Sequence, residues 1–372
     1  MAARFLDAAA RDLQIRPVVE PIGRALVAMS GGVDSSVAAA LLKEQGLDLV
    51  GVTLHLWDAE GDRQVGRCCA PEDRDHARRA CEHLGIPHYV FDERRAFRRA
   101  VVDPFIAAYR AGTTPSPCVH CNREVKLGGL LSIAEELGAT HVATGHYARI
   151  VRDPSGAPAL LRGVDRAKDQ SYFLYGAPRS ILERLVFPLG DLDKDRTRAE
   201  GRRLGVPGWD KKDSQELCFV PDGDVGGFVE RETGARAAGR IVDETGRALA
   251  SHDGVYRYTV GQRRGLGLGG GEPRYVLRIV PDTAEVVVGS EQALYASSAR
   301  ATDASWMGEP PREPFEAEVQ VRYRHAAAPA RVTPREDGFE VDFHAPQRAI
   351  APGQAAVVYR GDRVIGGGLL VA

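Results

Sequence analysis

The pattern of apolar and polar positions divides the chain into two parts. Up to about residue 180, short apolar runs alternate with amphipathic stretches rich in helix-forming residues. The apolar runs predict strands at residues 24–30, 48–57, 87–92 and 141–146, and the amphipathic stretches predict helices at residues 35–46, 71–85 and 123–138. Because strands and helices alternate, this part is predicted to be an α/β domain in which helices wrap a parallel sheet.

After about residue 180 the pattern changes. One more charged helix is predicted at 193–207, and from about residue 239 short apolar runs alternate with Gly and Pro turns. These runs predict strands at residues 274–280, 284–290, 315–324 and 355–361. Such spacing is typical of a small β-rich module followed by a β-barrel or a β-sandwich. The predicted domains are an α/β domain at 1–185, a small central domain at 186–290 and a C-terminal β-barrel at 291–372.

Composition limits the classes of protein to which the chain can belong. Its 372 residues include 49 basic and 51 acidic ones, for a net charge of −2. This balance argues against a protein that coats nucleic acid through bulk charge, although local basic patches can still bind it. No apolar run reaches the ~20 residues of a membrane span. Residues 1–17 predict a short amphipathic helix and lack the apolar core of a secretory signal.

Cysteines occur at positions 68, 69, 81, 118, 121 and 218. Their spacing does not resemble a secreted disulfide framework, so a cytoplasmic protein with catalytic cysteines is predicted. Cys81 falls inside a predicted helix and is expected in the core. Cys118 and Cys121 follow Pro115 and Pro117, which favour an extended approach. From these residues alone, the pair could be half of a metal site, a redox pair, or one nucleophile with a neighbour.

The segment at residues 30–36, SGGVDSS, lies between the first strand and the first helix. Gly31 and Gly32 allow backbone N–H groups to turn toward an anion, and a helix N-terminus adds partial positive charge. Asp34 is unexpected beside an anion unless a cation also binds, and Mg²⁺ between a phosphate and this carboxylate would account for it. The segment is not a Walker A loop. The alternative is an ordinary Gly-Gly turn with serine caps.

SGGVDSS after a first strand resembles the pyrophosphate loop (PP-loop) of the N-type ATP pyrophosphatases. Members of that superfamily cleave ATP between the α- and β-phosphates and adenylate an oxygen of the acceptor. The resemblance implies ATP and Mg²⁺ as cofactors. It implies ATP contacts at Ala28, Met29, Ser30, Gly31, Gly32, Val33, Asp34, Ser35, Leu54 and Gly145. Apart from the resemblance, Leu54 would simply be a core residue.

Later segments narrow the resemblance. The segments 114–126, 143–149, 168–175, 187–198, 214–224 and 321–325 follow in order and resemble the motifs of the tRNA-specific 2-thiouridylases, the MnmA family. The resemblance implies ATP-dependent 2-thiolation of the wobble uridine (U34) of tRNA. ATP adenylates O2 of the uracil and pyrophosphate leaves; a sulfur nucleophile then attacks C2 and AMP departs. It also implies tRNAs of the Lys, Glu and Gln type as partners, and a cysteine desulfurase or sulfur-relay protein.

The family divides the sulfur step between two cysteines. By resemblance, Cys121 is the working cysteine, and Cys218 in the central domain carries the persulfide, with a disulfide between them as an intermediate. Cys121 precedes the helix predicted at 123–138, whose N-terminus would lower its pKa. Many relatives carry Asn-Pro-Asp where this chain has residues 116–118. Since the Cys118 thiol lacks a carboxylate's acceptor oxygens, contact with the target base then falls to backbone groups of that segment.

Other interpretations remain open. One is a non-enzymatic tRNA-binding protein that retains the fold, although the intact loop and both cysteines argue against it. Cys118, Cys121 and Cys218 could ligate an iron–sulfur cluster, whose open iron would deliver sulfide; a structural zinc site is a weaker option. A small-molecule ATP pyrophosphatase, acting as a ligase or amidase, would keep the loop but leave both catalytic cysteines without a role. Cys68 and Cys69 could take part in sulfur handling or be incidental.

The resemblance also implies a set of tRNA contacts. They are Ser116, Pro117, Cys118, His146, Lys168, Asp169, Gln170, Arg322, Tyr323 and Gln354. An arginine beside a tyrosine suits phosphate contact with base stacking, although such residues are more often the solvent face of a strand. Two basic helical runs, at 93–102 and 196–203, could hold tRNA phosphates or be solvated faces.

Overall fold

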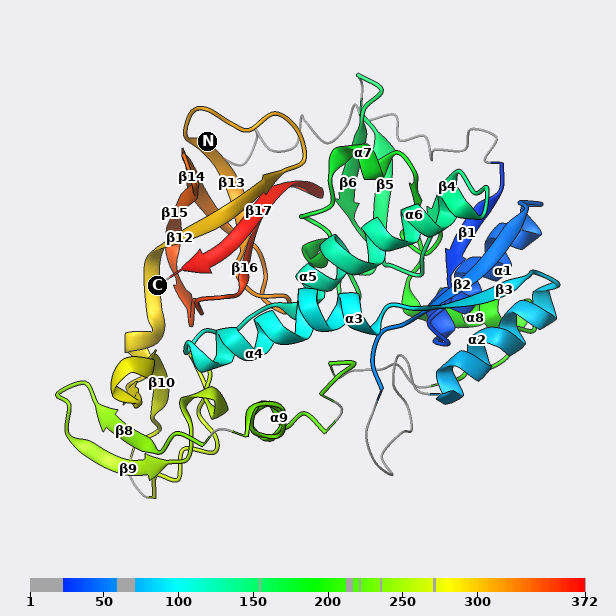
Figure 1. Cartoon of the computed structure of the whole chain (residues 1–372). Coiled ribbons are helices and arrows are strands. Elements are labelled where there is room, and N and C mark those ends of the chain that lie inside the picture. Colours follow the sequence, from blue (N-terminus) through cyan, green and yellow to red (C-terminus); the bar gives the residue numbers. More distant parts are fainter. Residues whose placement is uncertain are drawn as a thin grey trace. The chain divides into compact units, whose positions relative to one another are not determined.

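The computed structural model describes residues 23–58, 71–153, 155–211, 217–220, 222–234, 236–269 and 272–371 (Figure 1). The helix predicted at 1–17, the neighbouring Cys68 and Cys69, and most of the motif at 214–224 before Cys218 lie outside these residues. The chain divides into two compact units. Unit 1 consists of Met1–Arg98, Val119–Phe219 and Arg360–Ile365, and unit 2 of Arg99–Cys118, Val220–Tyr359 and Gly366–Ala372.

Unit 1 is built on a parallel sheet, as predicted. Its strands are β1 (Ala25–Ala28), β2 (Leu49–His55), β3 (His88–Asp92), β4 (His141–Ala143) and β7 (Leu185–Val186), in the order β3-β2-β1-β4-β7. All four neighbouring pairs are parallel. Leu26 and Val27 are both fully buried. Neighbouring side chains of a strand point to opposite faces, so β1 is covered on both sides, which explains its continuous apolar run.

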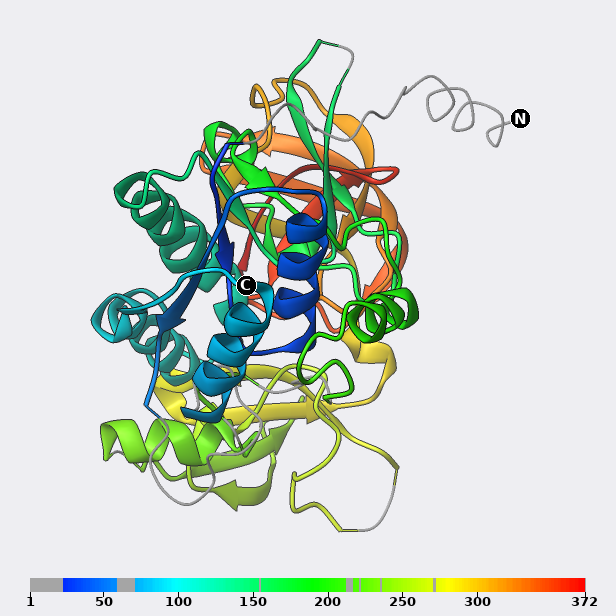
Figure 2. The ribbon, with the colours of Figure 1, turned by 90° about the vertical axis from the view of Figure 1, so that its right-hand side faces the viewer.

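The helices of unit 1 include α1 (Val33–Glu44), α2 (Pro71–Leu84), α3 (Arg94–Phe97), α6 (Gly128–Glu136), α7 (Arg179–Leu182) and α8 (Lys194–Arg203), with a 3₁₀ turn, η4 (Ser171–Phe173). Of these, α1, α2 and α6 contact strands of the sheet. Helix α1 contacts both α2 and α8, and Figure 2 shows α1 and α2 next to each other. The buried residues Ala39, Ala77 and Cys81 join β1 in one core cluster, because small side chains allow the helices to approach closely.

The strand order places the loop at a switch point of the sheet. From β1 the chain continues to β2 on one side, and β4 joins β1 on the other. Ligands of open α/β sheets bind beyond the carboxyl ends of strands at such a point. Residues 29–32 follow β1 and residues 144–146 follow β4, so both segments lie at this edge. A hairpin, β5 (Ala148–Arg152) and β6 (Pro158–Arg162), completes unit 1.

The helix predicted at 123–138 begins earlier than expected. A continuous helical run is formed by α5 (Pro117–His120), the π-helix η3 (Cys121–Leu127) and α6. Pro117 is the first residue of this run, where a missing N–H costs nothing and the fixed φ suits a helix. The predicted extended approach therefore ends at Ser116. The placement of Cys121 ahead of the helix was wrong.

Unit 2 contains a small mixed sheet. Its strands are β8 (Gly239–Asp243), β9 (Ala248–His252), β10 (Tyr275–Val280) and β11 (Glu285–Gly289), in the order β10-β11-β8-β9. The helical elements are η2 (Arg98–Val102), α4 (Asp103–Arg110), α9 (Val225–Thr233), η5 (Val255–Arg257), η6 (Pro281–Thr283) and η7 (Gln292–Leu294). Helix α9, which was not predicted, is capped by the Asp224 carboxylate and ends at Gly234 with φ +64°.

The C-terminal β-barrel is confirmed. Its strands are β12 (Tyr295–Trp306), β13 (Phe315–Gln320), β14 (Ala328–Arg335), β15 (Gly338–Arg348), β16 (Ala355–Arg360) and β17 (Arg363–Val371). They follow the order β12-β15-β14-β13-β16-β17, and pairing of β12 with β17 closes the ring and removes free edges. The strand predicted at 315–324 ends at Gln320, so Arg322 and Tyr323 lie in a turn.

Candidate active site

The loop between β1 and α1 presents the amino end of a buried helix. The Ser30 backbone N–H donates to Oγ of Ser35 over 3.2 Å, and the Ser36 hydroxyl donates to the Gly32 carbonyl over 3.0 Å. Gly31 has a φ of +76°, in the left-handed region. Gly32 is the N-cap residue and has no side chain to cap α1. The first-turn N–H groups are therefore oriented as an anion site requires.

Asp34, in the first turn of α1, is paired with a lysine of α8. Nζ of Lys194 donates to both carboxylate oxygens of Asp34, over 2.8 and 3.0 Å. The hydroxyl of Tyr147 donates to the same carboxylate over 2.8 Å. The sequence suggested that Asp34 needs a cation, with Mg²⁺ as the candidate. In the structure the ammonium group of Lys194 pairs with this carboxylate, and the Mg²⁺ contact stays a prediction.

Two other residues predicted to contact ATP lie near the same loop or on the neighbouring strand. Gly145 follows β4, and a Cβ at this position would lie 2.7 Å from both the carbonyl carbon of Asp34 and the backbone nitrogen of Ser35. Only glycine lets the end of β4 come this close to α1. Leu54 lies on β2, partly buried, opposite Phe91 of β3. Met29 and Val33 are buried and Ala28 is partly buried, and these residues anchor the two ends of the loop.

The cysteines occupy different environments. Cys121 is buried with 6% exposure, whereas Cys118 and Cys218 are partly exposed; all three are present as thiols. Cys121 and Cys218 belong to unit 1, and Cys118 is the last residue of its segment in unit 2. Phe219, next to Cys218, packs edge-on against Phe97 with ring centroids 5.7 Å apart. This contact anchors one side of the Cys218 segment.

Cys81 is a core residue, as expected. Its side chain is fully buried on α2, and burial raises the pKa of its thiol to about 12. A thiol with such a pKa is not a nucleophile at neutral pH. By contrast, Cys121 is the fifth residue of its helical run. The positive end of the helix dipole acts within the first turn, on residues 117–120, rather than on Cys121.

Gln354 holds the segment that leads to Cys118. Its Nε2 donates to the carbonyls of Thr114 and Pro115, over 2.9 and 3.2 Å. The Thr114 N–H donates to the Pro352 carbonyl over 2.8 Å. Ser116 is buried with 6% exposure. Gln354, predicted as a tRNA contact, therefore fixes the backbone that was expected to meet the target base.

His146 is held as a neutral imidazole. Its Nδ1 lies 2.7 Å from the Thr144 hydroxyl, and its ring packs edge-on against Phe187. Burial, with a smaller effect of Lys126, lowers its pKa to about 3. At neutral pH this side chain therefore has hydrogen-bonding capacity and no charge to offer a phosphate.

The segment 168–170 is tied into unit 1. Asp169 has 6% exposure and accepts hydrogen bonds from Nη1 of Arg162 and from the backbone N–H and hydroxyl of Ser171, all between 3.0 and 3.1 Å. Oε1 of Gln170 accepts from the Tyr147 backbone N–H over 3.0 Å. The carboxylate of Asp169 therefore serves the fold. Lys168 is partly buried, and its predicted tRNA contact stays a prediction.

Arg322 and Tyr323 lie in a turn shaped by a buried glutamine. Nε2 of Gln320 donates to the carbonyls of Arg322 and Tyr323, over 3.1 and 2.7 Å. Nη2 of Arg322 donates to the Val260 carbonyl over 3.4 Å. Both predicted tRNA contacts are partly exposed, and the turn gives them a defined backbone.

Comparison with known proteins decides the family. A tRNA methyl transferase HUP domain matches residues 23–222, a tRNA methyl transferase PRC-barrel domain matches 226–290, and an aminomethyltransferase beta-barrel domain matches 296–370. The tRNA-specific 2-thiouridylase MnmA of Sorangium cellulosum is 53% identical over 357 residues, covering 94% of this chain and 92% of that protein. The MnmA of Chloroflexus aggregans is 51% identical, covering 92% and 97%. The chain belongs to the tRNA-specific 2-thiouridylase family.

Solved structures are more distant. The U34-tRNA thiolase NcsA from Methanococcus maripaludis is 19% identical with a TM-score of 0.34, covering 57% of this chain and 67% of its own. A 4-thiouridine synthetase bound to RNA and ATP is 18% identical with a TM-score of 0.33, covering 57% of this chain and 50% of its own.

Within this 2-thiouridylase, the first matched domain runs to residue 222 and includes Cys218. The boundaries predicted at 185/186 and 290/291 stay predictions.

The described residues of this 2-thiouridylase offer no ready-made metal site. Among them, no group of three or more His, Cys, Asp and Glu side chains could hold a metal ion. The Asp34 carboxylate of the loop is bonded to Lys194. No helix within the described ranges has both the length and the hydropathy that crossing a membrane requires.

Sequence reasoning missed the partners of the loop. Lys194 falls within the motif at 187–198 but was read only as part of a charged helix. Asp73 of α2 was also missed: a Cβ at Gly31 would lie 2.1 Å from its carbonyl oxygen. The Asp73 carboxylate is buried, pairs with Lys211, and has its pKa raised by burial. The signal available in the sequence was the position of Asp73, which lies on the apolar face of the amphipathic helix α2.

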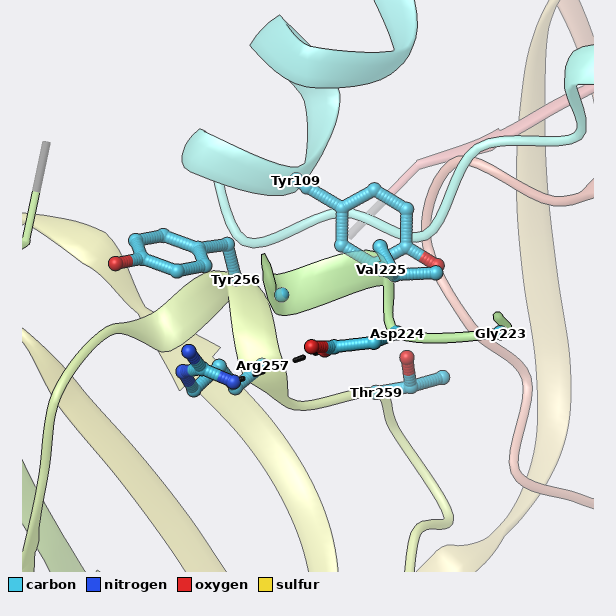
Figure 3. Close-up of a pocket in the computed structure, with 8 residues that line it drawn as sticks. Tyr109, Gly223, Asp224, Val225, Tyr256, Arg257 and Thr259 are labelled. Carbon is cyan, nitrogen blue, oxygen red and sulfur yellow. Dashed lines mark ion pairs between the residues drawn. The ribbon is translucent and has the colours of Figure 1, made fainter. Parts of the chain in front are cut away.

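Unit 2 contains a small pocket at the start of α9 (Figure 3). Its volume is about 230 Å³, and it is lined by Tyr109, Gly223, Asp224, Val225, Gly226, Tyr256, Arg257 and Thr259. The carboxylate of Asp224 is directed toward Arg257, 3.7 Å away, and Arg257 also pairs with Glu230 over 2.7 Å. Because its charges are paired internally, the pocket lacks the excess positive charge that phosphate recognition requires.

Proposed function

We propose that this protein is an ATP-dependent tRNA-uridine 2-sulfurtransferase that acts on the wobble uridine. Identity of 53% to a curated 2-thiouridylase across 94% of the chain carries the assignment. The uncapped amino end of α1, at the switch point of a parallel sheet, supports the ATP half of the reaction. Both cysteines that the family uses are present, as Cys121 and Cys218.

In the ATP half-reaction, the first-turn N–H groups of α1 and the hydroxyls of Ser30 and Ser35 bind the phosphates. Gly145 has no side chain, so the end of β4 can approach the loop between β1 and α1. Mg²⁺ enters with ATP and neutralises phosphate charge. The uracil O2 attacks the α-phosphorus, the bond to the pyrophosphate breaks, and an O2-adenylated uracil forms. Adenylation makes the oxygen a good leaving group, because AMP departs in place of hydroxide.

In the sulfur half-reaction, Cys218 carries a persulfide supplied by a cysteine desulfurase or a sulfur-relay protein. The Cys121 thiolate attacks the Cys218 sulfur, so that hydrogen sulfide leaves and a Cys121–Cys218 disulfide forms. The hydrogen sulfide attacks C2, and AMP leaves with the former oxygen. The disulfide is reduced by a cellular dithiol before the next turnover. The sulfane sulfur gains the two electrons that the two thiols lose.

The substrates are tRNAs of the Lys, Glu and Gln type, and the reaction takes place in the cytoplasm. His146 contacts the tRNA as a neutral group, whereas Lys168, Arg322 and Tyr323 provide charge and stacking. Gln354 acts through the backbone of residues 114–118. These assignments follow the resemblance of each segment to the family, together with the bonds described above.

The test is thiolation of an unmodified glutamate or lysine tRNA with ATP, Mg²⁺ and sulfide or a persulfide donor, read as 2-thiouridine by mass spectrometry. Sulfide bypasses the persulfide, so the cysteine variants are tested with the persulfide donor. With that donor, Cys218→Ser should lose thiolation. Cys121→Ser should do the same, and both variants should retain tRNA binding. Cys81→Ser is the matched control, a buried thiol outside the site, and should thiolate normally.

Anaerobic purification separates this mechanism from the cluster alternative. A colourless protein that makes 2-thiouridine supports the persulfide pair. If only a brown, iron-containing protein does so, the two-cysteine mechanism is wrong. Cleavage of ATP to AMP without any 2-thiouridine would instead favour the small-molecule ATP pyrophosphatase.

A further inference from the structure

Lys194 is the first residue of α8 and is fixed by contacts on three sides. Its backbone N–H donates to Oδ2 of Asp165 over 3.0 Å. Its ammonium group donates to both oxygens of Asp34 and lies 5.9 Å from the centre of the Tyr147 ring. Only 12% of its side chain is exposed. A lysine restrained in this way has already lost most of its rotamer freedom before any ligand binds.

The partner of Lys194 occupies an unfavourable position for a bare carboxylate. Asp34 lies in the first turn of α1, beside the N–H groups that would receive the phosphates, and 35% of its side chain is exposed. An unpaired carboxylate there would repel a polyanion over a few ångströms, through a medium less polar than water. The Lys194 ammonium removes this charge, and the Tyr147 hydroxyl satisfies the same carboxylate.

We propose that Lys194 is a positioning residue for the ATP step. This inference rests on the ATP half of the proposed function. Its ammonium group holds Asp34 against Tyr147 and cancels the carboxylate charge, so that ATP meets only the N–H groups and hydroxyls of the loop.

The docking of α8 does not depend on the ammonium group. A Cβ at Gly201 would lie 2.9 Å from the Val37 side chain, so α8 packs closely on α1 about two helical turns along α8 from Lys194. The Tyr147 hydroxyl is also bonded to Thr197 of α8 over 3.0 Å. Replacement of Lys194 by methionine, which keeps the length of the side chain, should therefore leave the fold intact.

The chain offers a matched control on the same two helices. Arg203 of α8 pairs with Glu44 of α1 over 2.7 Å, and both side chains are about half exposed. Arg203→Met therefore also removes a cation that joins α8 to α1, but at the far end of α1 from the loop. A loss that came only from loosening the two helices should appear in both variants.

The experiment measures ATP binding and tRNA-dependent pyrophosphate release over a range of Mg²⁺ concentrations. Lys194→Met should raise the KM and Kd for ATP by about 10- to 100-fold, the effect of losing a charge-assisted contact. The kcat should fall much less. The Lys194→Met variant should also need more Mg²⁺ for half-maximal ATP binding, because its unpaired Asp34 carboxylate then repels the phosphates of ATP. Arg203→Met should match the wild type in ATP affinity and in its Mg²⁺ dependence.

A second variant tests the cause. In Lys194→Met/Asp34→Asn the repelling carboxylate is gone, so ATP affinity and Mg²⁺ dependence should return most of the way to the wild-type values. The inference is overturned if Lys194→Met binds ATP normally, or if the double variant is no better than the single one. ATP binding by the wild type is read separately from 2-thiouridine. A wild type that binds ATP but never thiolates would refute the proposed function alone.

Discussion

Gly145 allows a direct test of how closely the end of β4 packs against the first turn of α1. It follows β4, and a Cβ placed on it would lie 2.7 Å from two backbone atoms, the carbonyl carbon of Asp34 and the nitrogen of Ser35. Ordinary van der Waals contact begins at 3.4 Å, so the shortfall is about 0.7 Å. Since both atoms belong to the backbone, no side-chain rotation can relieve the clash.

Gly145→Ala should therefore displace the first turn of α1 or the end of β4. An overpacked core position costs about 1–3 kcal/mol. This energy corresponds to about 5- to 150-fold in an equilibrium constant. Because the displaced atoms belong to the phosphate loop, we expect the change in both the free energy of unfolding and the Kd for ATP.

The measurements are urea unfolding and equilibrium binding of ATP. Gly129→Ala is the control: this glycine lies in α6 of the same unit, and a Cβ there would meet nothing within 4 Å. That variant should be stabilised by about 0.5–1 kcal/mol, because alanine loses less entropy than glycine in a helix. If Gly145→Ala unfolds and binds ATP like the wild type, the close approach of β4 to α1 has been misjudged.

Three further predictions concern other parts of the chain. Gln354→Leu leaves two carbonyls without their donor and should destabilise unit 2 by about 1–3 kcal/mol; thiolation should fall with it, and unchanged unfolding and thiolation would contradict the role of Gln354. Cys81, with its pKa raised to about 12, should resist alkylation in the native protein at pH 8, so rapid labelling would show that it is accessible. The pKa of His146 is lowered to about 3 from the ordinary 6.5, so its neutral form stabilises the fold fully above pH 6.5 and progressively less as pH falls toward 3. His146→Gln should flatten this acid-side dependence of the unfolding free energy, and an unchanged slope would show that His146 is not its source.

Some predictions succeeded because the signal is local. The apolar run at 24–30 and the helix formers at 35–46 predicted β1 and α1 to within a few residues, since burial on both faces of a parallel strand leaves a visible trace in sequence. Alternation of strands and helices likewise predicted the parallel sheet. The helix start at Pro117 was missed, because proline favours both the end of an extended segment and the first turn of a helix.

The sequence by itself determined which elements form, where glycine must stand in the loop, and which family the motifs resemble. Only the tertiary structure decided which side chains meet. It paired Lys194 with Asp34, Gln354 with the Thr114 carbonyl, and Asp169 with Arg162. Periodicity records whether a position is buried, because burial acts on each residue separately. The partner across a long chain separation depends on how strands and helices pack, and a single sequence carries no periodic trace of that choice.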